Sequence, residues 1–318
     1  MTPHARAWLQ IHVCVVLWGF TAILGRLITM PALPLVWWRM LLVTVALAAW
    51  PPVWRDLRRM PPRLVAVYLG IGVLVTLHWI TFYGSIKLSN ASVAATCMAL
   101  TPVFVSIIEP SLARRRPHLA EVGMSVAVLP GVALVVGGTP AGMRTGIAVG
   151  AVSALIAGIF SSLNKRAIGS SPALTVTGLE MAAGALLLPP LAWLLPAADA
   201  VVVQPSLHDG ALLLLLAVAC TLLPYALALV ALRYLSAFET TLAVNLEPVY
   251  AIALAIVLLN EQRDLEPGFY LGVALIMGIV FSHPWVSRRW GRNRTLGPPS
   301  GGPGAGESRP PRTQFQSL

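Results

Sequence analysis

Apolar residues occur along this chain in long runs, which short polar segments interrupt. Each run is about 20 residues long, and this length matches the hydrocarbon thickness that a helix must cross in a bilayer. The runs are continuous, whereas a transmembrane barrel would show alternation over about ten residues. The pattern therefore predicts an all-α integral membrane protein.

We interpret these runs as ten transmembrane helices, separated by segments rich in proline, glycine and charge. The first run is followed by many others and lacks a small-residue cleavage site, so we interpret it as a span rather than a removed signal peptide. The predicted spans cover residues 8–28, 34–53, 63–86, 91–113, 118–137, 145–164, 172–195, 209–232, 239–260 and 267–286.

Composition supports the membrane interpretation. Hydrophobic residues make up 57% of the chain and charged residues 11%, against roughly 25% charged residues in soluble domains. The net charge of +10 would suit nucleic acid, but most arginines fall in short loops and the tail, where membrane topology explains them. We therefore expect a lipid bilayer as partner and no nucleic acid.

The basic residues are distributed unevenly between the two sides of the predicted bundle. Among residues 1–294, fifteen lysines and arginines fall on the side that carries both termini, and four fall on the other side. Because cytoplasmic loops carry the excess of positive charge, this predicts a multi-pass protein of the cell membrane with both termini in the cytoplasm.

The C-terminal segment, residues 287–318, differs from the rest. A basic patch is followed by a stretch rich in glycine and proline, a composition that does not form a hydrophobic core. We predict a disordered cytoplasmic tail whose arginines are solvated or contact anionic lipid head groups. The three cysteines, Cys14, Cys97 and Cys220, lie within apolar runs and are predicted to be packing residues.

Two fragments indicate an internal duplication. Residues 100–104 read Leu-Thr-Pro-Val-Phe, and residues 246–250 read Leu-Glu-Pro-Val-Tyr. Three further pairs of similar fragments occur in the same order in the two halves of the chain. One of them is Arg39-Met40 with Glu180-Met181. The chain thus divides into five-helix repeats at 1–140 and 141–286. Because five is odd, the second repeat enters the membrane inverted, as in many transporters.

The sequence resembles an EamA-type member of the drug/metabolite transporter superfamily over about residues 8–286. The resemblance implies a 5+5 inverted-repeat fold around a central cavity, lined by spans one, three, four, six, eight and nine. It also implies transport of small solutes, often export of amino acids or other metabolites. This chain departs from the family at the end of span four, where it has Glu109-Pro110 and related sequences often have a Gly-Glu pair. The stretches that carry the resemblance are residues 17–20, 78–90, 223–225, 231–236 and 246–250.

Three charged residues inside spans are candidates for the transport site, because a charge at a helix centre costs about 2.5–3.5 kcal/mol on insertion scales. Arg39 could bind a carboxylate or phosphate, or form a structural pair or snorkel to the interface. Glu180 and Glu247 could exchange protons or hydrogen-bond permanently. Protons are thus the coupling ion that we consider.

The prolines Pro102 and Pro248 are helix-break candidates, because each removes a backbone hydrogen bond and frees a carbonyl within a span. The position before each proline differs between the repeats, with Thr101 in the first and Glu247 in the second. The predicted site is therefore asymmetric in its chemistry.

Polar and aromatic residues complete the candidate cavity wall. His78 could relay protons, and the aromatic residues of span three share a face. The alternative for all of them is ordinary helix packing, which small residues favour on span six. The candidates are Trp18, His78, Trp79, Tyr83, Asn164 and Tyr225.

The chain carries no phosphate-binding loop and no zinc-protease motif, so we expect no cofactor, no metal and no enzymatic activity. The pattern favours a secondary transporter of small metabolites, such as amino acids or drug-like solutes, which works by alternating access and exports them. A membrane enzyme acting on lipid-linked substrates and a non-transporting scaffold are the alternatives. The pattern specifies no oligomeric state.

Overall fold

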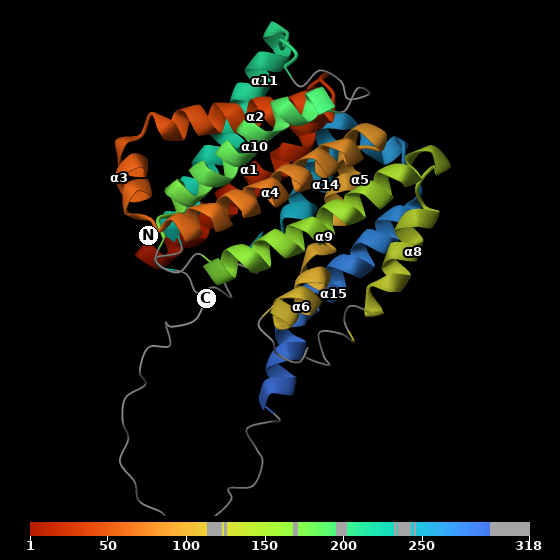
Figure 1. Ribbon diagram of the computed structural model, residues 1–318. Helices are drawn as coiled ribbons and strands as arrows, with labels where there is room; N and C mark the ends of the chain where they lie inside the picture. Colours follow the sequence, from red (N-terminus) through yellow and green to blue (C-terminus); the bar gives the residue numbers. More distant parts are fainter. Residues whose placement is uncertain are drawn as a thin grey trace, which may run out of the picture.

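The computed structural model describes residues 1–112, 123, 126–167, 171–194, 202–231, 234, 243–244 and 246–292. All regular secondary structure in these ranges is helical. The long helices form a bundle in which segments distant in sequence lie side by side (Figure 1).

The first half of the chain supplies seven described helices. α1 begins after Thr2, whose hydroxyl accepts a hydrogen bond from the Ala5 amide, with Pro3 at the first helical position; this is a favourable helix start. The helices are α1 (Pro3–Leu27), α2 (Ala32–Ala48), α3 (Pro51–Arg59), α4 (Pro62–Leu88), α5 (Ala91–Met98), α6 (Thr101–Leu112) and α8 (Leu129–Gly137).

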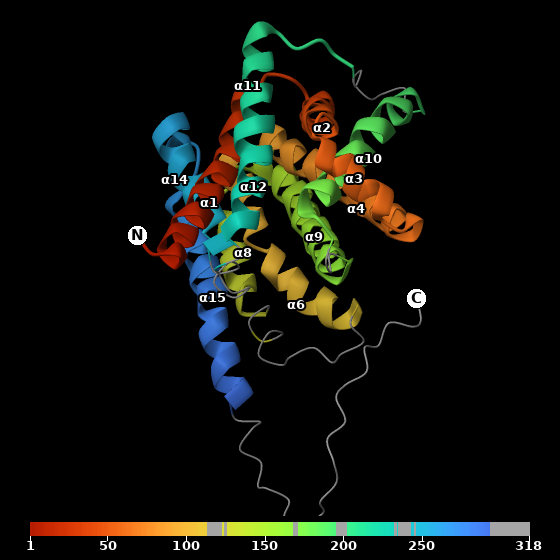
Figure 2. The same ribbon diagram turned by 90° about the vertical axis from the view of Figure 1, so that its left-hand side faces the viewer.

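The second half of the chain follows after a short connection. A π-helical segment, η2, joins α11 to α12, so that the two form one continuous rod beside α1 (Figure 2). The elements are η1 (Ala141–Met143), α9 (Arg144–Ala167), α10 (Ala173–Leu194), α11 (Leu207–Ala217), η2 (Val218–Leu222), α12 (Leu223–Ala231), α14 (Glu247–Leu259), η3 (Glu261–Arg263) and α15 (Pro267–Arg292).

Within the described residues, five helices are long and apolar enough to cross a membrane, or six if the bent pair α2–α3 is one span. The apolar helices Leu207–Leu222, Glu247–Leu259 and Pro267–Ile279 are shorter. The prediction of one span over residues 34–53 was wrong at its end. α2 stops at Ala48, and α3 turns away by 87°, because the prolines at 51 and 52 start a new helix rather than continue the old one.

In each half of the chain, a helix begins within the repeated motif. In the first half, α5 ends at Met98 and α6 begins at Thr101, so Pro102 is the second residue of α6. In the second half, α14 begins at Glu247, so Pro248 is the second residue of α14. A proline in the first turn leaves no helical hydrogen bond unmade. Each proline therefore lies in the first turn of a helix, and α5 and α6 together still form one candidate span, Ala91–Leu112.

At the C-terminal end, α15 continues to Arg292. This helix includes residues 287–292 of the segment predicted as a tail, and the disorder of that tail stays a prediction. Residues 293–318 lie outside the described part of the chain. All three cysteines are free and buried, as the sequence indicated.

Contacts between helices follow a twofold pattern. α4 packs on α9, and α1 packs on α12; in terms of the repeats, both are contacts between a first and a third span. Two further pairs of contacts correspond when the two halves are swapped. The α5–α9 contact corresponds to the α1–α14 contact, and the α4–α10 contact corresponds to the α2–α11 contact. The two halves of the chain thus contact each other through corresponding helices.

α2 and α10, the second helices of the two halves, pack antiparallel. Near the start of α2, the Trp37 indole N–H donates to the Ala185 carbonyl at 3.0 Å. Near its end, Leu47 lies against Gly178, which is earlier on α10. Equivalent helices that run in opposite directions are the arrangement expected of an inverted pair.

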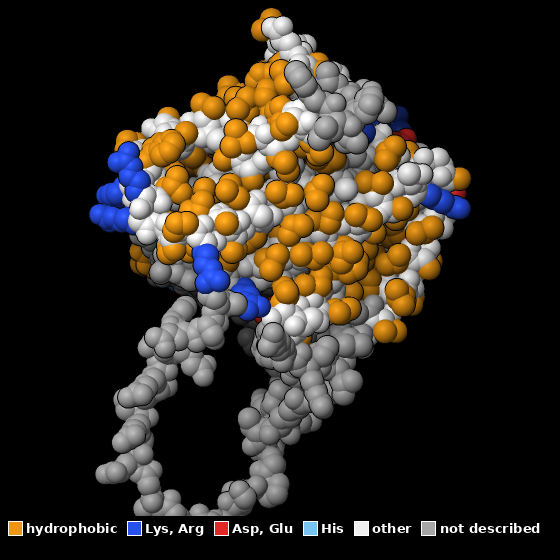
Figure 3. All heavy atoms as spheres, in the orientation of Figure 1, with side chains coloured by type: hydrophobic (Ala, Val, Ile, Leu, Met, Phe, Trp, Pro, Cys, Tyr) orange, Lys and Arg blue, Asp and Glu red, His pale blue; other side chains and the backbone are white. Residues whose placement is uncertain are grey.

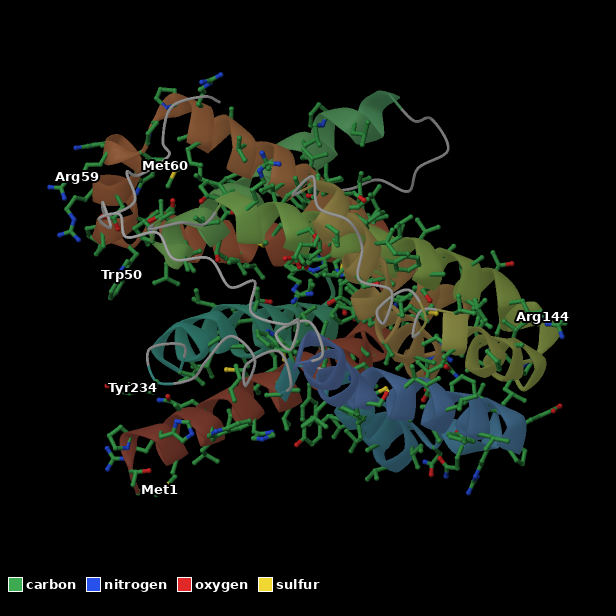
Figure 4. The ribbon with its side chains drawn as sticks, turned by 90° about the horizontal axis from the view of Figure 1, so that it is seen from below. Met1, Trp50, Arg59, Met60, Arg144 and Tyr234 are labelled. Atoms are coloured by element: carbon green, nitrogen blue, oxygen red, sulfur yellow. The ribbon has the colours of Figure 1, made fainter. Side chains whose placement is uncertain are left out.

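Charge and apolar surface are separated on the molecule. Hydrophobic side chains cover the middle of the face in Figure 3, and blue Lys and Arg side chains lie mainly toward its margins. Figure 4 places Met1, Arg59 and Tyr234 at one end of the bundle and Arg144 at the other. We call these ends the α3 end and the Arg144 end.

Candidate functional site

The centre of the candidate site is Arg39 on α2, with only 3% of its surface exposed. Its Nε donates to the Thr221 hydroxyl at 2.9 Å, and its Nη1 donates to the Tyr83 hydroxyl at 2.7 Å. Its guanidinium carbon lies 3.7 Å from the centroid of the Trp79 ring. An uncompensated buried cation costs several kcal/mol, and these contacts offset that cost. We call Arg39, Trp79, Tyr83 and Thr221 the Arg39 cluster.

The Arg39 cluster joins the two halves of the chain. Trp79 and Tyr83 are four residues apart on α4, so they lie on one face of that helix. Thr221 belongs to η2, where its hydroxyl donates to the Leu216 carbonyl, five residues earlier, at 3.0 Å. Single-turn π-helical segments occur frequently at functional sites. Here the π-helical turn directs Thr221 toward Arg39.

Glu180 on α10 occupies a separate buried site, with 4% of its surface exposed. The Asn164 side chain of α9 lies next to its carboxyl group, while the Oε1 of Glu180 has no partner among the described residues. α4 approaches closely here, because a Cβ on Gly72 would lie 2.5 Å from the Glu180 carbonyl oxygen. The described residues show no ion pair between Glu180 and Arg39, its equivalent in the first half.

Glu247 begins α14 and lines a small cavity with Trp18 on α1. The cavity volume is about 10 Å³, enough for roughly one water molecule. Glu247 and Arg39 interact electrostatically across this region, but no ion pair joins them in the described structure. The other lining residues are Ala22, Phe82, Ala95, Met98, Pro248 and Ala251.

The remaining candidates have different surroundings. His78 faces α9, where its Nδ1 lies 2.9 Å from the Ser153 hydroxyl and 3.1 Å from the Ser153 carbonyl oxygen; its ring packs beside Phe160. It therefore belongs to the α4–α9 interface, outside the Arg39 cluster. The side chains of Pro102 and Tyr225 lie outside the described part of the structure.

Two buried carboxylates connect the halves at the Arg144 end. Asp209, at the start of α11, accepts the Thr29 amide at 2.9 Å and the Thr29 hydroxyl at 2.7 Å. Glu261, in η3, accepts the amides of Ala91 and Ser92 at 2.9 and 2.8 Å. These amides belong to the first turn of α5, where backbone N–H groups lack helical partners and favour a negative charge. The two carboxylates thus hold the Arg144 end together.

Sequence reasoning did not single out Thr221, Asp209 or Glu261 as site residues. Thr221 is a hydroxyl within a nearly uninterrupted apolar run, and this isolated polar residue was a usable signal. The bonds of Asp209 and Glu261 depend on which loops meet in space. A local sequence pattern does not predict which distant loops contact each other.

Comparison with known proteins identifies the two halves separately. The model of the EamA-like transporter family matches residues 6–137 and 144–283. A search of curated proteins finds no match. Among solved structures, one described only as the crystal structure of a protein covers 90% of this chain and 99% of its own, with 19% identity and a TM-score of 0.59. At that identity the similarity concerns the fold alone.

Proposed function

This chain belongs to the EamA-like transporter family, so it is a multi-pass membrane transporter, and we propose that it moves small metabolites as a secondary transporter. In the proposed architecture, each repeat has five spans, and the two repeats are inverted with respect to one another. The α3 end and both termini face the cytoplasm of the cell membrane, and the two halves alternate between opening to either side.

The observation that carries this proposal is the composition of the Arg39 cluster. Arg39, Trp79 and Tyr83 come from the first repeat and Thr221 comes from the second, and the cluster is buried between them. Transporters of inverted-repeat architecture bind solute near the bilayer midplane at such a junction. Membrane-embedded charges are most often functional.

The charges present suggest the class of solute. Arg39 provides a cation, and Glu247, which lines the neighbouring cavity, provides an anion. The described structure shows no ion pair between these two residues. A zwitterion offers the complementary pair of charges. This supports amino acids as the first solutes to test, with export as the direction that we propose.

The small cavity indicates a closed conformation. A volume of about 10 Å³ holds roughly one water molecule, so an amino acid requires the surrounding helices to separate. The bonds of Asp209 and Glu261 close the Arg144 end in this conformation. On this proposal, exchange of access requires those bonds to break during the cycle.

The experiment begins with a thermal-shift screen of the purified protein against amino acids, nucleosides, sugars and cationic drugs. A solute that stabilises the protein is then measured for uptake into proteoliposomes without ATP. We expect saturable uptake, reduced at least about tenfold by Arg39→Lys, because a lysine lacks the planar fork that reaches Tyr83 and Thr221 together.

Arg144→Lys is the matched control, because Arg144 is exposed at the first residue of α9; its uptake should equal that of wild type. A stabilising solute that enters proteoliposomes no faster than protein-free liposomes would contradict the proposal. Equal uptake by the wild type and Arg39→Lys would remove Arg39 from the site.

A further inference from the structure

Helix α3 lies across one end of the bundle. It is bent by 87° from α2, so it runs across the direction of the long helices, at the left of Figure 1. Its apolar side faces the protein, where Val53 is buried next to Gly178 of α10. If the long helices cross the bilayer, α3 lies nearly in the plane of the membrane surface.

The opposite side of α3 is basic. Arg55, Arg58 and Arg59 are exposed, and their spacing of three and four residues places them on one face. The group forms a blue cluster at the left edge of Figure 3. Asp56 lies 3.6 Å from Arg55, whereas the described residues provide no ion pair for Arg58 or Arg59. The face thus keeps a positive charge.

These arginines border a hollow at the bend between α2 and α3. Its volume is about 510 Å³, and it is lined by Trp54, the three arginines and three small residues, Ala48, Ala49 and Pro51. Ligand pockets are typically about 300–1,000 Å³, so a phosphate-bearing head group fits by size. The Trp54 indole N–H donates to the Ala48 carbonyl at 2.6 Å, which fixes the ring across the bend.

Two tryptophans place the hollow at the level of lipid head groups. Trp50 and Trp54 are 56% and 48% exposed. Exposed tryptophan is enriched at the boundary between hydrocarbon and water, and amphipathic helices with a basic face lie in that plane. A lipid bound here would present its phosphate to the arginines and keep its acyl chains beside the apolar surface.

We propose that the hollow between α2 and α3 binds the phosphodiester head group of an anionic phospholipid. Guanidinium groups match phosphate oxygens by paired hydrogen bonds, and anionic lipid attracts basic segments at the membrane surface. The α2–α3 bend makes the site, since a straight span would place these arginines along the helix instead of around a hollow. This site is independent of the proposed transport cycle.

Native mass spectrometry of the full chain tests the site. The purified protein is equilibrated with equal amounts of phosphatidylglycerol and phosphatidylcholine, and no solute is added. We expect wild-type protein to retain phosphatidylglycerol at least about fivefold over phosphatidylcholine, consistent with attraction by several arginines. The variant R55Q/R58Q/R59Q should lose that preference.

The matched control is R26Q/R144Q/R263Q, which removes three exposed arginines outside α3 and should keep the preference. If the triple variant at α3 does not purify as a folded protein, Arg58→Gln alone should show an intermediate loss. Equal retention of both lipids by wild type, or an unchanged preference in the α3 variants, would overturn the proposal.

A third arm distinguishes a lipid from free phosphate. Inorganic phosphate at millimolar concentration should neither stabilise lipid-free protein nor displace phosphatidylglycerol. If it does both, and R55Q/R58Q/R59Q abolishes the effect, the hollow binds small anions and the lipid assignment is overturned. Because no step uses transport, neither result bears on the proposed function.

Discussion

Arg39 and Glu247 are single charges in an apolar bundle, and their environments differ. The guanidinium of Arg39 is engaged by Thr221, Tyr83 and Trp79, so its position is fixed. Glu247 lines a small cavity and begins a helix, so its carboxyl has room to contact a water molecule in this conformation. We therefore propose that Arg39 binds the solute and that Glu247 carries any proton exchange.

Glu247→Gln tests this assignment. Glutamine keeps the shape of the side chain but cannot exchange a proton in the accessible pH range. If Glu247 couples proton and solute movement, wild-type uptake in proteoliposomes should vary with pH, whereas the variant's uptake should be slower and independent of pH. Asp264→Asn, an exposed carboxyl outside the cavity, is the control. A variant with wild-type uptake at every pH would exclude the proton role.

Some of these residues were predictable and others were not. Arg39, Glu180 and Glu247 are marked by the cost of charge within apolar runs, a property of sequence alone. Thr221 contacts Arg39 only because a π-helical turn directs its hydroxyl inward. His78 looked similar to Trp79 and Tyr83 in sequence, yet it faces α9. Neighbours on one broad helical face can meet different helices.

Among the elements, α4 and α10 make a close contact that depends on a glycine. A Cβ on Gly72 would lie 2.5 Å from the Glu180 carbonyl oxygen and 2.7 Å from its Cα. These atoms are backbone and cannot rotate away. Small residues at helix interfaces in membranes allow such approach.

Gly72→Ala should therefore lower the thermal stability of the purified protein, by about 1–3 kcal/mol from overpacking. Gly70→Ala is the matched control, because a Cβ there meets nothing within 4 Å. Both substitutions gain helix propensity of about 1 kcal/mol, so the difference between their unfolding temperatures isolates the contact. Equal unfolding temperatures would show that α4 and α10 are not this close.

Glu261 links η3 to the first turn of α5 through two amides. Glu261→Gln leaves one carbonyl oxygen and no negative charge for two amide donors. We expect a loss of about 1–3 kcal/mol in stability, the usual cost of an unsatisfied buried hydrogen-bonding group. Glu266→Gln, an exposed position in the same loop, should leave the unfolding temperature unchanged. A similar shift of the unfolding temperature in both variants would mean that any substitution in the loop lowers stability, and that the bonds of Glu261 have no special role.

At the scale of the whole molecule, the repeat was predictable because its signal is sequential. The proline motifs and paired charges give two halves, and the family model matches each half. The 87° bend at α3 was not predicted, because Ala49 and Trp50 extend the apolar run and mask the end of α2. The pairing of helices across the halves also depends on distant contacts. The number of spans and their orientation stay predictions.

Transport as we propose it requires the two halves to exchange access to the cavity between them. Ala95 and Ala251 line that cavity and come from different halves, and both are 3% exposed. A cysteine at either position, in a chain whose three buried cysteines are replaced by alanine, reports which side reaches the cavity. The reagent is a membrane-impermeant maleimide, applied separately from each side of oriented proteoliposomes.

We predict labelling of Ala95→Cys and Ala251→Cys from both sides. It also predicts that Glu261→Gln raises the labelling rate from the Arg144 end and lowers the rate from the α3 end, since opening on one side closes the other. Labelling from one side only, with no change in Glu261→Gln, would contradict alternating access and leave a static membrane protein.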